Sequence, residues 1–456
     1  MAPDRSAGGG GATICSGVLP LLLACTAAPG PPVGVVIVSL DTLRVDRLGA
    51  WGSTAGLTPN LDRFASESVR FEHAYSPSNE TLYSHAALFT GRYPSRLDSL
   101  DGEFAVPTRT PLLAEVFADA GWDRAAFVAG GHLSRSFGLD RGFREYHDSN
   151  SWGSLQATGA EALAWLDTRS SEAPFFLFVH GYDVHDRALK PSPFGYATAS
   201  PEGAGLGVRL AREVGGASRV LGGHAVGDEA VLEVAAVSPP RHAHGVGAVP
   251  LDPGATALTA ADRAHLADVY DGAVAWLDLQ FGRLVAGLEE RGLLDDVVVV
   301  VVADHGEELG ENGVFAHRSS MDDAVLHVPL LVRLPGGARG GQRVAAPVSL
   351  LDVAPTVLAL AEVPAALYGD GQSLVPVFGD AAAPAERVMI AEGGLRLLSA
   401  RSPRSRLTVE GISLDNAYLP EVLRVGPLDG ETIRLSGAPD DEPALRRALL
   451  AHLAGR

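Results

Sequence analysis

Five short, continuous apolar runs constrain the fold of this chain more than any other feature. They are VGVVIVSL (33–40), RAAFVAG (124–130), PFFLFVH (174–180), DVVVVVVA (296–303) and VPLLVRL (328–334). Runs of this length that are rich in β-branched and aromatic residues predict strands buried on both faces, as a parallel sheet requires. Helical patterns lie between the runs. We therefore expect an α/β sandwich whose central, mostly parallel sheet is flanked by helices.

The patterns between and after these runs suggest the domain organisation. Helical periodicity occupies the ranges 58–69, 110–121 and 258–292, the last with Thr259 as its expected cap and Gly292 as its end. Residues 190–257 are rich in Gly, Ala, Pro and Val, and we interpret them as an irregular insertion or lid with room for a hairpin. Antiparallel strands and a closing helix are expected after residue 378. The prediction is a catalytic domain over 33–378 and a small C-terminal α+β subdomain over 379–456.

Residues 1–32 are predicted to be a leader and tether rather than part of the fold. A short apolar stretch ends in LLAC, which resembles the lipobox of bacterial lipoproteins. The resemblance implies an exported protein that is anchored to the membrane through an acylated Cys25. An ordinary signal peptide cut near Ala28 would give a periplasmic or extracellular protein, and an uncleaved anchor is a third interpretation. Beyond Cys15 and Cys25 the chain has no cysteine, which excludes a disulfide framework and thiolate chemistry.

The amino-acid composition limits the classes of molecule that this protein is expected to bind. The net charge of −19 argues against nucleic acid, whose binding proteins are usually basic. An anionic substrate would have to meet a locally positive pocket on this acidic protein. With 456 residues, 46% of them hydrophobic, the chain can bury a large core. The oligomeric state does not follow from the sequence.

Charged and metal-binding side chains follow several of the predicted strands. Asp41 follows the first run, His180 and His185 lie at the end of the third, and Asp304 and His305 follow the fourth. Open parallel sheets bind ligands beyond the carboxyl ends of their strands, so we expect these side chains to converge. Carboxylates and imidazoles together suit one divalent cation, such as Ca²⁺, Mg²⁺, Mn²⁺ or Zn²⁺.

The stretch TLYSHAALFTGR (81–92) predicts a short helix that begins with Thr81. One interpretation is that Thr81 only caps this helix. The other is that Thr81 is a nucleophile, because coordination to a cation lowers the pKa of a hydroxyl. The N-terminus of a helix also offers backbone N–H donors to an anion. We favour the second interpretation, with Thr81 as a further metal ligand.

Five motifs occur in one order over some 300 residues and are similar to those of a known family. They are VVIVSLDTLRVDRLGAWG, TLYSHAALFTGRYPS, ADHGEELGENG, FAHRSSMDDAVLHVPLLVRLPG and LLDVAPTVLALA. In this order they resemble the sulfatase family of the alkaline-phosphatase superfamily. The resemblance implies that family's sandwich fold and the metal-dependent hydrolysis of sulfate or phosphate esters. It implies one divalent ion, with Ca²⁺ as the usual choice of the family.

The resemblance also implies roles for individual residues. The metal ligands would be Asp41, Thr81, Asp304 and His305. His185 would contact the leaving-group oxygen or the transferred group, and His317 would bind the anion; both are candidate catalytic residues. Arg318 takes the place of the family's lysine, and His85 that of the arginine in the signature motif. Both are candidates for substrate binding.

Two departures from the family pattern bear on the chemistry. Thr81 stands where sulfatases have the cysteine that becomes formylglycine, and Thr42 stands in place of a second aspartate. We expect a hydrolase of sulfate or phosphate esters on small molecules, glycans or lipids, with Thr81 as the nucleophile. The alternatives are a phosphodiesterase or phosphotransferase of the same superfamily, and a catalytically inactive, surface-tethered binding protein.

Overall fold

A computed structural model gives the fold of most of the chain. The structure describes residues 32–97, 105–149, 153–169, 172–185, 218–226, 229–236, 260–310, 315–318, 320–364, 369–379, 387–393, 397–402, 404–410, 433–436 and 439–455. All of them belong to one compact unit that begins at residue 31. The predicted leader with Cys25, most of the 190–257 insertion and the cap Thr259 lie outside the described residues.

A nine-stranded sheet forms the centre of this unit. Its strands are β1 (Gly34–Leu40), β2 (Val69–Tyr75), β3 (Asp123–Phe127), β4 (Glu145–His147), β5 (Phe175–Gly181), β8 (Val297–Val302), β11 (His327–Val328), β12 (Leu330–Arg333) and β13 (Arg343–Ser349). They run in the order β11-β2-β12-β8-β1-β5-β3-β4, and β13 pairs with β2. Strands β8, β1, β5, β3 and β4 are parallel to one another. The expected mostly parallel α/β sheet is therefore confirmed.

Two elements differ from what the sequence pattern predicts: one strand runs in the other direction, and one helix is shorter. The run 328–334 was expected to be a parallel strand, but β12 lies antiparallel to both β8 and β2. Helix α1 (Pro59–Ser66) also ends before the helical pattern 58–69 does, and Val69 already begins β2. An apolar run shows that a strand is buried but carries no information on its direction, which depends on the connection that precedes it.

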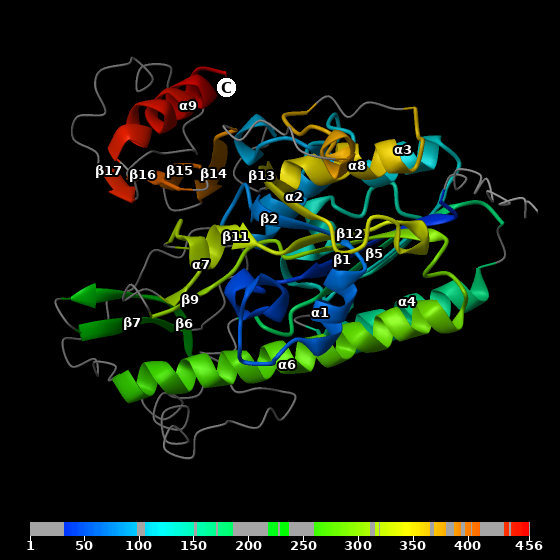
Figure 1. Cartoon of the computed structure of the whole chain (residues 1–456), viewed down its shortest axis with the longest axis horizontal. Coiled ribbons are helices and arrows are strands. Elements are labelled where there is room, and N and C mark those ends of the chain that lie inside the picture. The colour runs from blue at the N-terminus through cyan, green and yellow to red at the C-terminus, as the bar shows by residue number, and fades with distance from the viewer. Residues whose placement is uncertain are drawn as a thin grey trace, which may run out of the picture. The chain divides into compact units, whose positions relative to one another are not determined.

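Helices cover both faces of the sheet. One layer contains α2 (Thr81–Thr90), α3 (Leu113–Asp119) and α8 (Val353–Leu360), and the other contains α1, α4 (Leu155–Thr168) and the long α6 (Ala260–Glu290) (Figure 1). Strands β1, β5 and β8 are buried along their whole length between these layers. Such two-sided burial explains their continuous apolar sequences. The described residues contain no helix that is both long and apolar enough to cross a bilayer.

The remaining elements form two smaller sheets. A hairpin of β6 (Ser218–Val226) and β7 (Glu229–Ala236) lies within the predicted insertion, and β6 pairs with β10 (Phe315–Ala316), which pairs with β9 (Glu308–Leu309). Near the C-terminus, β14 (Met389–Gly393), β15 (Leu397–Arg401), β16 (Arg406–Glu410) and β17 (Ile433–Ser436) form an antiparallel sheet. Helix α9 (Glu442–Ala454) packs on this sheet through Leu445 and Leu449. The short helix α7 (Asp323–Leu326) precedes β11.

Candidate active site

The register of three parallel strands brings the predicted site residues to one edge of the sheet. Ser39, two residues before Asp41, lies beside His180 on β5 and beside Val302 on β8, two residues before Asp304. Because these strands end level with one another, the side chains that follow them emerge at the same edge. The side chains of Asp41, Asp304 and His180 are completely buried there.

The carboxylates of Asp41 and Asp304 are only partly satisfied by the protein. Oδ2 of Asp41 lies 3.2 Å from Nε2 of His180, and Oδ1 of Asp304 accepts from the backbone N–H groups of Thr42 and His305 at 3.1 and 2.8 Å. The other two oxygens, Oδ1 of Asp41 and Oδ2 of Asp304, are buried and make no hydrogen bond within the described part of the chain. Burying a carboxylate oxygen without a hydrogen-bond donor raises the free energy of the folded state. A cation bound to these two oxygens would offset that cost.

Thr81 lies between the acids and His305. It is the first residue of helix α2, and its Oγ1 is 3.3 Å from Oδ2 of Asp41 and 3.2 Å from Nε2 of His305. The residue before it, Glu80, occupies the cap position, and its side chain makes no capping hydrogen bond. Thr81 is therefore not the cap of its helix. Its hydroxyl points into the acidic cluster instead.

Hydrogen bonds fix the tautomers of two buried imidazoles. Nδ1 of His305 lies 3.0 Å from the carbonyl oxygen of Gly306 and must donate to it, so in the neutral ring the lone pair is on Nε2. Nδ1 of His85 donates to the carbonyl oxygen of Thr81 at 2.7 Å, and its Nε2 accepts from the hydroxyl of Ser39 at 2.9 Å. Burial lowers the pKa of His85.

These contacts correct the role expected of His85. Both ring nitrogens are bonded to protein atoms, and the side chain is completely buried beneath Thr81. Binding of substrate by His85 would break at least one of these buried hydrogen bonds. The ring instead holds the first turn of helix α2 against strand β1.

The two acids have opposite pKa shifts. Burial raises the pKa of Asp41 well above its usual range, and the charge of Asp304 raises it further. Burial acts to raise the pKa of Asp304 as well, but the nearby imidazoles, His305 foremost, outweigh it, and the pKa is lowered. The pKa of His180 is lowered well below its usual value by burial, and then by His85. Without a cation, the protein therefore stabilises one negative charge at this site rather than two.

A strained turn directs a backbone donor into the site. Thr42 has a φ of 56°, in the left-handed region that residues other than glycine seldom adopt. The hydroxyl of Tyr270 on helix α6 donates to the carbonyl oxygen of Thr42 at 2.7 Å and accepts from the N–H of Arg44 at 2.9 Å. These bonds hold the turn that points the N–H of Thr42 at Asp304. The strain thus serves to orient the carboxylate of Asp304.

His317 and His185 complete a row of imidazoles beside the acids. The ring centroids of His305 and His317 are 4.2 Å apart, and those of His317 and His185 are 5.4 Å apart. Arg318 is partly exposed, and its guanidinium lies 3.7 Å from the carboxylate of Glu80. The structure therefore brings His317 and His185 close to Thr81 through His305, and it places Arg318 beside the residue that precedes Thr81.

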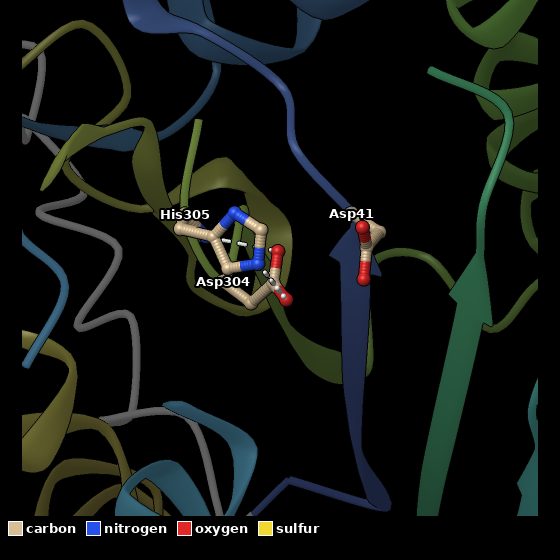
Figure 2. A group of neighbouring side chains, drawn as sticks. All are labelled: Asp41, Asp304 and His305. Atoms are coloured by element: carbon tan, nitrogen blue, oxygen red, sulfur yellow. Dashed lines mark hydrogen bonds and ion pairs between the residues drawn. The ribbon is translucent and has the colours of Figure 1, made fainter. Parts of the chain in front are cut away.

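The donor set fits a divalent cation. Asp41, Asp304 and His305 each offer one ligand atom, and these atoms lie within 4.8 Å of one another. Figure 2 shows Asp41 at the tip of β1, across from Asp304 and His305, which come from the chain that follows β8. Oδ1 of Asp41 and Oδ2 of Asp304, which make no hydrogen bond within the described residues, both belong to this group. Oxygen and imidazole ligands suit several divalent ions, so the donors do not select one of them.

Comparison with known proteins agrees with this fold. The model of the family described as "Sulfatase" matches residues 34–363, most of the chain. The chain belongs to the sulfatase family. Among its relatives, the steryl-sulfatase of Mus musculus is 29% identical over 430 residues, with 78% of this chain and 66% of that protein covered. The ulvan-active sulfatase of Formosa agariphila is 26% identical over 348 residues, with 72% of this chain and 61% of that protein covered.

The fold of this chain is also similar to that of proteins whose structures have been solved. The phosphonate monoester hydrolase of Agrobacterium radiobacter is 19% identical and superposes with a TM-score of 0.65, covering 93% of this chain and 94% of that one. At this level of identity only the fold is shared with certainty. The chain spans less than two thirds of the length of the two sulfatase relatives described above. The expected alkaline-phosphatase-like fold of the sulfatase family is confirmed.

Sequence reasoning did not give a role to three residues that build the site. His180 was noted only as a residue at the end of a strand, yet it contacts Asp41. Its position at the end of the apolar run 174–180 was the signal that could have assigned it. Ser39 and Asn79 carry no such signal, because their partners, His85 and the 317–320 segment, are brought to them by the fold.

We predict that the Asp41 carboxyl makes the metal-free protein progressively less stable as the pH rises above the usual pKa of 3.8. A carboxyl whose folded pKa is raised above its usual value of 3.8 favours the folded state while protonated, and this contribution disappears as the pH passes the folded pKa. Thermal unfolding in excess chelator should show this contribution as a fall in the stability of the wild type relative to Asp41→Asn, which lacks the carboxyl. The matched control Asp119→Asn, on an exposed side chain, should keep it. An unchanged pH dependence in Asp41→Asn would contradict the assignment.

Proposed function

We propose that this protein hydrolyses sulfate or phosphate esters, with Thr81 as the nucleophile. The observation that carries the proposal is the position of the Thr81 hydroxyl, within 3.3 Å of both Asp41 Oδ2 and His305 Nε2 at the N-terminus of helix α2. A nucleophile needs a proton acceptor within hydrogen-bonding reach and donors for the group it attacks. Asp41 supplies the first, and the backbone N–H groups of the helix N-terminus supply the second.

The first half of the proposed reaction forms a threonyl ester. Thr81 Oγ1 attacks the phosphorus or sulfur atom while its proton passes to Oδ2 of Asp41, the oxygen to which it is already hydrogen-bonded. The bond to the leaving alkoxide breaks, and His317, protonated at Nε2, gives its proton to that oxygen. His185, whose ring lies next to His317, binds the leaving group on the same side.

The second half reverses these roles. The neutral His317 takes a proton from water, which attacks the same atom, and the bond to Thr81 Oγ1 breaks. The proton held by Asp41 returns to Thr81. Each proton that leaves a side chain is thus restored at the end of the cycle. A divalent cation held by Asp41, Asp304, His305 and Thr81 would supply positive charge that favours ionised oxygen at this site.

The threonine favours phosphate esters over sulfate esters. A family member with formylglycine avoids hydrolysing a covalent ester, whereas Thr81 must be released by attack of water at phosphorus or sulfur. Sulfate esters make this step harder. We therefore place phosphate monoesters or diesters of small molecules, glycans or lipids ahead of sulfate esters as substrates. This also keeps a phosphodiesterase or phosphotransferase of the superfamily as the second candidate.

Substitution of Thr81 tests the nucleophile. Thr81→Ala should lower kcat/KM at least about a thousandfold on the best of three esters, because the variant lacks the hydroxyl that forms the intermediate. Thr81→Ser should retain measurable turnover. The assay compares p-nitrophenyl sulfate, p-nitrophenyl phosphate and bis(p-nitrophenyl) phosphate in a divalent cation. Wild-type inactivity on all three, or near-normal rates in Thr81→Ala, would favour the inactive binding protein or another nucleophile.

We further propose that the protein is exported and anchored to a membrane through acylated Cys25. The support is the LLAC sequence at the end of a short apolar stretch. Cys25→Ser in the full-length chain should move the protein from the membrane fraction to the soluble fraction. Cys15→Ser, in the same apolar stretch, is the matched control and should leave it in the membrane. If Cys25→Ser remains with the membrane, another anchor holds the protein.

A further inference from the structure

Asn79 makes an unusual set of contacts two residues before the nucleophile. Its side-chain Nδ2 lies 3.1, 2.9 and 3.1 Å from the carbonyl oxygens of His317, Arg318 and Ser320. Only the amide nitrogen can face three carbonyl oxygens, since the amide oxygen in that place would repel them. One side chain therefore contacts the backbone at three positions, 317, 318 and 320.

The backbone of Asn79 holds the imidazole of the same segment. Its carbonyl oxygen lies 2.7 Å from Nδ1 of His317, which must donate to it. The tautomer of His317 is thereby fixed, and in the protonated ring the transferable proton is on Nε2. Asn79 thus fixes both the main chain and the ring of His317.

The position of Asn79 is itself tightly defined. It is completely buried, and a Cβ atom added to Gly393 on strand β14 would lie 3.1 Å from its Oδ1. Strand β14 is tied to the same stretch of chain, since the N–H of Glu392 donates to the carbonyl oxygen of Pro77 at 2.9 Å. Asn79 is therefore confined between the C-terminal sheet and the 317–320 segment. Because Asn79 is confined in this way, it can move little, and it therefore helps to keep Thr81, two residues further along the chain, in a fixed position.

We propose that Asn79 is a positioning residue that sets His317 relative to the Thr81 nucleophile for protonation of the leaving group. The inference rests on the proposed function. Attack and protonation occur on opposite sides of the transferred group, so the two side chains must keep a fixed separation. Asn79 is covalently linked to Thr81 through Glu80 and hydrogen-bonded to His317, which makes it a short rigid link between them.

The test compares esters with good and poor leaving groups. A p-nitrophenolate leaves with little need for a proton, whereas an alkoxide depends on one, so loss of general-acid help should appear only with the second. In Asn79→Ala we expect kcat for p-nitrophenyl phosphate to stay within about threefold of wild type. For an alkyl phosphate kcat should fall about 10- to 100-fold, below the full general-acid effect of about 10²–10⁴, with little change in KM.

Three variants make the result specific. Asn79→Asp has the same size and should show the same selective loss, because a carboxylate would face three carbonyl oxygens. Asn60→Ala removes another partly buried amide, which binds Asp278 of helix α6, and should affect both esters equally or not at all. The double variant Asn79→Ala/His317→Ala should be no slower on the alkyl ester than His317→Ala alone, because both act through one step.

The outcomes separate this inference from the proposed function. If His317→Ala shows the selective loss while both Asn79 variants match wild type, the inference is wrong and the role of His317 stands. Equal losses on both esters in the Asn79 variants would mean a purely structural role and would also overturn it. If His317→Ala itself shows no selectivity, the proposed leaving-group role of His317 fails, and the inference with it.

Discussion

Two buried carboxylates that share one edge of the sheet are the constraint on which this structure depends. Asp41 and Asp304 are brought together by the register of β1 and β8, and each keeps one oxygen without a hydrogen bond within the described residues. Such a pair raises the free energy of the folded state unless a proton or a cation compensates it. The opposite pKa shifts of the two groups are the form that this compensation takes when only protons are available.

The elements around the pair orient it rather than neutralise it. Tyr270 holds the left-handed turn at Thr42, and His85 holds the first turn of helix α2. His180 contacts the Asp41 oxygen that also accepts from Thr81, which leaves the other oxygen for a ligand. Orientation by outer contacts of this kind is what metal ligands generally require. A hydroxyl, a proton acceptor and a helix N-terminus therefore meet at one point.

The sequence predicted those parts of the site that depend on strand ends. Residues that directly follow buried parallel strands, such as Asp41 and Asp304, can be placed from the pattern alone, because parallel strands end at one edge. The same logic failed for β12, because burial does not encode strand direction. The role of His85 was expected from the family resemblance alone, and in the structure both of its ring nitrogens are bonded within the fold. Asn79 could not be assigned, since its partners lie some 240 residues away along the chain.

The most direct measurement of the central claim is the position of a bound metal ion. Crystals of the protein grown with Mn²⁺ and measured at the manganese edge should show one strong anomalous peak. We predict that this peak lies between Oδ1 of Asp41 and Oδ2 of Asp304, with Nε2 of His305 and Oγ1 of Thr81 as further ligands. A peak elsewhere, or none at saturating Mn²⁺, Ca²⁺ or Zn²⁺, would contradict it.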